Sequence, residues 1–216
     1  MTALPTAPTD PAGVPDAGPY TIRNMDWDDL PRLAAMGKDG PDPWTYDDLA
    51  KVIESQYTLG VVCATPSGPA GFMVYVVSDG TGKAARKSGK LHLAAGVVRV
   101  QVAAEWRRKG VGRFLVEKVA EALVHQFSQR AAAGRLRLHA TVNESWLDGL
   151  LFLKGVGFKT PADKAVAIQR RPFGGACEFD GFLMERFTQW PAAGAAATPA
   201  PADSGGAPPD APRRAA

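Results

Sequence analysis

A short cationic turn decides the fold of this chain, and it reads Arg107-Arg108-Lys109-Gly110-Val111-Gly112. An apolar run at residues 97–102 precedes the turn, and a long amphipathic segment at residues 111–127 follows it. The pattern predicts a strand, a glycine turn and the start of a helix. Backbone N–H groups in a first helical turn lack partners within the helix, and the helix dipole places partial positive charge there. We therefore expect a diphosphate site, because glycine lets a ligand approach the backbone closely.

The composition around this turn fits one globular domain between two segments of low complexity. The chain has 216 residues, of which 45% are hydrophobic and 22% are charged. Residues 1–18 and the Ala/Pro-rich residues 191–216 offer few large apolar side chains for burial. We predict that both segments are disordered, which leaves a single domain at residues 19–190.

Several classes of protein are disfavoured. No Lys or Arg precedes Arg23 and no apolar run approaches the ~18 residues of a membrane span, so we expect neither a secretory signal nor a membrane partner. Cys63 and Cys177 have no metal-ligand spacing, so we expect no metal and two buried free thiols in the cytoplasm. The net charge of +3 permits anionic ligands but does not itself argue for a nucleic acid partner.

Hydrophobic periodicity and turn residues predict the element order β-α-α-β-β-β-α-β-α-β-β. Strands are expected at residues 20–23, 57–64, 71–77, 91–102, 136–142, 166–169 and 178–187. Helices are expected at about residues 27–36, 44–55, 111–129 and 145–154. Asp26 or Asp28 can cap the first helix and Thr45 the second, and Gly96 marks a candidate bulge in the third long strand.

This order and the turn resemble the GNAT (GCN5-related) N-acetyltransferase family. The family pattern V-x-P-x-Y-[RQ]-x-x-G-x-[GA] matches residues 102–112, with Ala104 in place of Pro and Trp106 in place of Tyr. The late Gly157-Phe158 pair is also similar. A Rossmann-type dinucleotide fold, the alternative, needs G-x-G-x-x-G in the turn, and that pattern is absent. The resemblance implies an α+β fold in which four helices flank a central mixed, mostly antiparallel twisted sheet of about seven strands.

The resemblance implies acetyl-CoA as the acetyl donor. Its diphosphate would lie on the backbone amides of residues 108–113, and its pantetheine arm would lie where the strands at residues 91–102 and 136–142 separate. A backbone N–H near Val102 would polarise the thioester carbonyl. Asn143 would either contact CoA or be only an N-cap or turn residue at the start of the next helix. The implied donor-binding residues are Val100, Gln101, Val102, Arg107, Arg108, Lys109, Gly110, Val111, Gly112, Arg113 and Asn143.

The catalytic groups depart from the family. Family members commonly use a Glu or a water as base, and a Tyr four residues before the Gly-Phe pair as acid, but that position holds Leu153. Thiols have pKa values near 8.5, so a thiolate can leave with little help from an acid. The candidate catalytic residues are His139 and Glu144, with His92 a further candidate base and water the default. A lone strand histidine can equally be a structural residue.

The resemblance implies direct attack by a primary amine of a small molecule or peptide. An α-amine has a pKa near 8 against about 10.4 for lysine, so it requires less help from a base. The acceptor would be held by two loops that carry Asp39, Asp42, Trp44, Tyr46, Arg170, Arg171 and Phe173. The alternative is a non-catalytic GNAT-fold acyl-CoA sensor or scaffold, which Leu153 favours. An exposed final strand could also pair in a homodimer.

Overall fold

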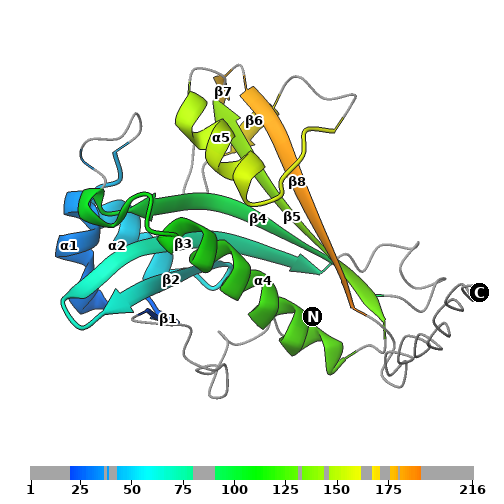
Figure 1. Ribbon diagram of the computed structural model, residues 1–216, viewed down its shortest axis with the longest axis horizontal. Helices are drawn as coiled ribbons and strands as arrows, with labels where there is room; N and C mark the ends of the chain where they lie inside the picture. The colour runs from blue at the N-terminus through cyan, green and yellow to red at the C-terminus, as the bar shows by residue number, and fades with distance from the viewer. Residues whose placement is uncertain are drawn as a thin grey trace, which may run out of the picture.

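The structure is a computed structural model that describes residues 20–36, 38, 43–79, 91–130, 133–143, 146–161, 167–170, 176–179 and 181–190. Its centre is a six-stranded sheet in the order β1-β2-β3-β4-β5-β8 (Figure 1). These strands are β1 (Thr21–Asn24), β2 (Thr58–Thr65), β3 (Gly68–Asp79), β4 (Leu91–Val102), β5 (Gly134–Asn143) and β8 (Gly181–Trp190). Neighbouring strands are antiparallel except β4 and β5, which are parallel. The expected mixed, mostly antiparallel sheet is confirmed.

The strand count needs a correction. Strands β6 (Ala167–Arg170) and β7 (Ala176–Phe179) pair only with each other, so the main sheet has six strands instead of about seven. The strand expected at residues 178–187 combines the end of β7 with most of β8. Strand β7 ends at Phe179 and β8 begins at Gly181, and Gly is frequent where a strand is interrupted.

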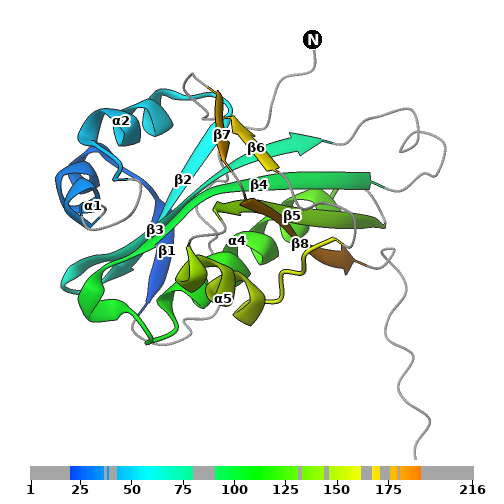
Figure 2. The ribbon, with the colours of Figure 1, turned by 90° about the horizontal axis from the view of Figure 1, so that it is seen from above.

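Helices cover the two faces of the sheet differently. The described residues form four α-helices, α1 (Leu30–Met36), α2 (Tyr46–Glu54), α4 (Val111–Ser128) and α5 (Leu147–Gly155), and two short 3-10 helices, η1 (Trp27–Asp29) and η2 (Ala104–Trp106). Figure 2 shows α1 and α2 on one side of the sheet and α4 and α5 on the other. Asp26 caps η1 and Thr45 caps α2, each in a capping box. Gly157, with φ +89°, ends α5 as expected.

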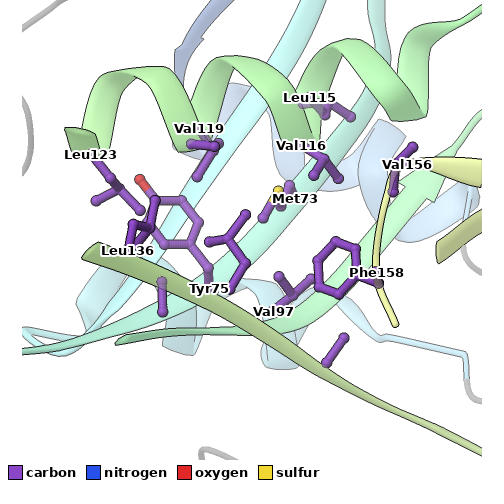
Figure 3. Packing of buried hydrophobic residues seen from close by; sticks show 14 of the residues in the cluster. Met73, Tyr75, Val97, Leu115, Val116, Val119, Leu123, Leu136, Val156 and Phe158 are labelled. Atoms are coloured by element: carbon purple, nitrogen blue, oxygen red, sulfur yellow. The ribbon is translucent and has the colours of Figure 1, made fainter. Parts of the chain in front are cut away.

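The main core lies between α4 and the sheet. Alternate residues of β4 and β5 point toward α4, and Tyr75 and Met73 of β3 join them below the helix (Figure 3). A smaller core packs α1 and α2 against Val62, Phe72 and Val74 on the opposite face. Cys63 is a buried free thiol, as expected, and burial raises its pKa to about 11.

A bulge changes the direction of side chains along β4. Tyr75 pairs with Val97 and Val74 with Arg99, so Val98 is the extra residue. The bulge therefore lies two residues beyond Gly96, where the sequence had suggested it. Gly96 pairs regularly, and its missing side chain has another cause: a Cβ there would lie 3.1 Å from Nε2 of His139.

Candidate active site

The separation of β4 from β5 defines the site. Their parallel pairing ends at Val97 and Ala140, although β4 continues to Val102 and β5 to Asn143. Figure 1 shows the two strands diverging toward α5. The bulge at Val98 follows the last pair, and bulges bend and twist a strand. The separation implied by the resemblance is confirmed, and it leaves edges of both strands without each other's backbone groups.

The N-terminus of α4 lies directly after this part of β4. Gly110 is the N-cap residue with φ +89°, its cap has no side-chain hydrogen bond, and no acidic residue occupies the first turn. A Cβ on Gly110 would meet nothing within 4 Å, so the space beside this turn is open among the described residues. Uncapped amides, the helix dipole and an open approach together make a site for an anion.

The cations of the turn lie beside these amides, and no described residue forms a salt bridge with them. Arg107, Arg108, Lys109 and Arg113 are all exposed. Arg107 donates its Nε–H to the carbonyl of Val102 at 3.2 Å, and Arg113 donates to the carbonyl of Gly155 at 3.0 Å. These two guanidiniums thereby fix the turn to β4 and α5 while keeping their charge beside the helix start.

Two predicted donor-binding residues, Val111 and Gly112, point into the protein. Val111 belongs to the main core, and a Cβ on Gly112 would lie 2.8 Å from the ring of Phe152 in α5. Gly112 thus allows the close packing of α4 on α5. Only the backbone N–H groups of these two residues are placed to meet a ligand.

The diverging end of β4 has different surroundings on its two faces. Val100 and Val102 pack on the main core. Gln101 is buried on the other face, where it donates to the carbonyl of Met36 at 3.2 Å and accepts a hydrogen bond from Arg99. At the predicted positions Val100, Gln101 and Val102, the backbone is therefore the part available along the gap toward β5.

His139 lies where the two strands begin to separate. It pairs with Gly96, one residue before the last pair of the ladder. Its ring is half-buried, and among the described residues its buried Nδ1 has no hydrogen-bond partner. Burial lowers the pKa of His139, nearby Arg137 lowers it further, and Glu185 raises it. The net direction favours a neutral imidazole, whose unprotonated nitrogen can accept a proton.

The other residues predicted for catalysis, acceptor binding and CoA contact are placed as follows. Glu144 lies outside the described residues, as do Asp39, Asp42, Arg171 and Phe173. Asn143 ends β5 and its carbonyl accepts from the N–H of Trp146, which is the N-cap of α5. Asn143 is therefore not the N-cap of α5, but it does belong to the turn before the helix, which is the other structural role expected for it. Leu153 is buried in the main core.

Sequence reasoning missed a charged cavity on the face of the sheet opposite α4. The cavity has a volume of about 510 Å³ and is lined by His92, Leu93, Ala94, Arg135, Arg137, Glu185 and Phe187. Arg137 pairs with Glu185 of the neighbouring strand. One signal was visible in the sequence, because Arg135 and Arg137 alternate with His139 along a single strand.

The chain matches known proteins in its structure but not in its sequence. No family model and no curated protein matches the sequence. Among solved structures, NAA60 of Arabidopsis thaliana in complex with acetyl-CoA is 15% identical with a TM-score of 0.57, covering 78% of this chain and 98% of that one. The ribosomal-protein-S18-alanine N-acetyltransferase of Escherichia coli is 17% identical with a TM-score of 0.51, covering 82% and 97%. The chain therefore has the fold of the GNAT acetyltransferases, as its sequence resemblance implied.

In the part of the chain that the structure describes, no cluster of three or more His, Cys, Asp or Glu residues could hold a metal ion. No helix among those residues combines the length and apolar character needed to cross a membrane.

Proposed function

We propose that this chain is an acetyl-CoA-dependent N-acetyltransferase that transfers an acetyl group to a primary amine of a small molecule or peptide. One observation carries the proposal: β4 stops pairing with β5 at Val97 and then leads directly into the uncapped N-terminus of α4. An open strand edge followed by an anion site fits a pantetheine arm followed by a diphosphate. The likeness to NAA60, which was solved with acetyl-CoA, supports the same donor.

The donor would be held mostly by backbone groups. The amides from Gly110 to Arg113 would bind the diphosphate, with Arg107, Arg108 and Lys109 supplying positive charge around it. The backbone of residues 100–102 would line the pantetheine arm. Asn143, across the gap at the end of β5, would contact the same arm.

His139 would act as the base. The neutral amine attacks the thioester carbonyl carbon and forms the new C–N bond, and the unprotonated ring nitrogen of His139 takes the proton that the amine nitrogen loses. The carbon–sulfur bond breaks and the electron pair leaves with sulfur as the CoA thiolate. A backbone N–H near Val102 would stabilise the charge that develops on the carbonyl oxygen. The buried Leu153 has no proton to give, so the thiolate would leave unassisted or take a proton from water.

A steady-state assay of CoA thiol release tests this proposal with a panel of α-amine peptides and small amines. We expect release that depends on the amine, with kcat reduced about 10²- to 10⁴-fold in His139→Gln. Glu144→Gln distinguishes the two candidate bases. If Glu144 is the base, kcat should fall in Glu144→Gln and not in His139→Gln. Unchanged turnover in both variants would leave water as the base.

A second function is favoured by one feature, the buried Leu153 in place of an acidic Tyr. This function is an acyl-CoA-binding sensor or scaffold without turnover. It predicts equal thermal stabilisation by acetyl-CoA and CoA, and no thiol release with any amine. The free thiol of Cys63 suits the reducing cytoplasm for either function.

A further inference from the structure

The cavity opposite α4 is not used by the proposed donor site. It lies over β4, β5 and β8, on the face where His139 points, because residues 135, 137 and 139 alternate with the core residues of β5. Among the described residues, two guanidiniums line it, those of Arg135 and Arg137, against one carboxylate, that of Glu185. The cavity is therefore an electropositive surface beside the candidate base.

Both guanidiniums keep donors for a ligand. Arg137 uses one terminal nitrogen on Glu185, and within the described part of the chain its buried Nε has no hydrogen-bond partner. The guanidinium of Arg135 lies 3.7 Å from the ring centroid of Phe187. A guanidinium stacked on a ring face keeps its N–H groups at its own edge, where a carboxylate can bind two of them.

The rise per residue of β5 sets how far the two guanidiniums lie from His139. Residues along a strand advance by about 3.3 Å, so Arg137 and Arg135 lie about 7 Å and 13 Å from His139 measured along β5. An extended acceptor peptide has nearly the same rise for each residue. An acceptor with its amine at His139 and its chain running over this face would place its third to fifth residues at the two guanidiniums.

We propose that this cavity is a specificity subsite for a carboxylate of the acceptor, located about 7–13 Å from the reacting amine. The inference rests on the proposed acetyl transfer and names the acceptor class: an amine that carries an acidic group two to four residues away. Basic acceptors are disfavoured by the same two guanidiniums. Glu185 holds Arg137 in place through one terminal nitrogen, and the Arg137 side chain stays 39% exposed to an incoming acid.

Matched peptides test the subsite. Peptides with Glu, Gln or Lys at the third position are compared as acceptors at about pH 8, above the ordinary pKa of histidine, so that His139 stays neutral in every variant. We expect kcat/KM for the Glu peptide to exceed that for the Gln peptide about tenfold through KM, which is about 1.4 kcal/mol. Arg137→Gln and Arg135→Gln should each reduce this preference while the Gln peptide keeps its kinetics.

Arg130→Gln is the matched control. Arg130 also stacks on a ring, with its guanidinium 5.0 Å from Phe127, but it lies at the end of α4. The preference should survive in that variant. Melting temperatures show whether each variant is folded. Arg135 forms no ion pair with a described residue, so Arg135→Gln serves if Arg137→Gln is unstable.

The outcomes separate this inference from the proposed function. If both the Glu and the Gln peptide are acetylated with equal kcat/KM, the subsite is overturned and the proposed acetyl transfer stands. If no peptide is acetylated, peptide affinity measured by fluorescence anisotropy decides: tighter binding of the Glu peptide that is lost in Arg137→Gln supports the subsite, and equal binding overturns it.

Discussion

Replacing Gly110 by alanine distinguishes the contribution of the turn to acetyl-CoA binding from its contribution to stability. At φ +89°, alanine in place of glycine would strain the backbone by about 1–2 kcal/mol. No atom lies within 4 Å of the new Cβ, so strain is the whole cost to stability. In a domain of this size the melting temperature should fall by about 2–8 °C.

The loss of free energy in acetyl-CoA binding should be larger than the strain energy in the backbone. The new methyl group projects into the open space beside the uncapped amides, where the diphosphate is proposed to bind. Losing one hydrogen bond to a charged group costs about 1.5–3 kcal/mol. Calorimetric titration should therefore show acetyl-CoA binding about 10- to 150-fold more weakly to Gly110→Ala than to the wild type.

Gly157→Ala is the control for strain. Gly157 has the same φ of +89°, and a Cβ there would make only ordinary contacts with Arg186. It ends α5, so its substitution should lower stability by a similar amount and leave the acetyl-CoA Kd unchanged. Wild-type affinity of Gly110→Ala for acetyl-CoA, or an equal loss of affinity in Gly157→Ala, would show that the start of α4 does not bind the diphosphate.

Three further outcomes are expected. The proposed base is the neutral form of His139, whose pKa is lowered, so kcat should fall with decreasing pH only below the usual pKa of histidine. A pH profile of His139→Gln should lack this limb. Glu185→Gln removes the group that raises this pKa, so the limb should move to lower pH, and a shift to higher pH would contradict the assignment. Gly96→Ala pushes a Cβ against the His139 ring and should lower kcat while the acetyl-CoA Kd measured by calorimetry stays constant; equal kcat would show that the ring position is unimportant.

The fold could be predicted because its signals are local. The strand before Arg107, the glycines of the turn and the amphipathic helix after it are adjacent in sequence. The same locality explains the Thr45 cap and the glycine end of α5. The division of the last strands was missed because only one residue separates the end of β7 at Phe179 from the start of β8 at Gly181.

The site was only partly predictable because its parts come from distant strands. The bulge at Val98 depends on how β4 pairs with β3, and a sequence pattern cannot show which residue is extra. The Arg137–Glu185 pair joins residues 48 positions apart, so only the sheet order brings them together beside His139. Val111 and Gly112 follow the family motif, yet packing turns both away from the ligand side.

A crystal structure with acetyl-CoA would test whether the gap between β4 and β5 is the donor site. We expect the diphosphate on the amides of Gly110 to Arg113, the pantetheine arm between the two strands, and the thioester beside His139. Acetyl-CoA bound elsewhere, or with its diphosphate away from the start of α4, would show that this gap is not the donor site.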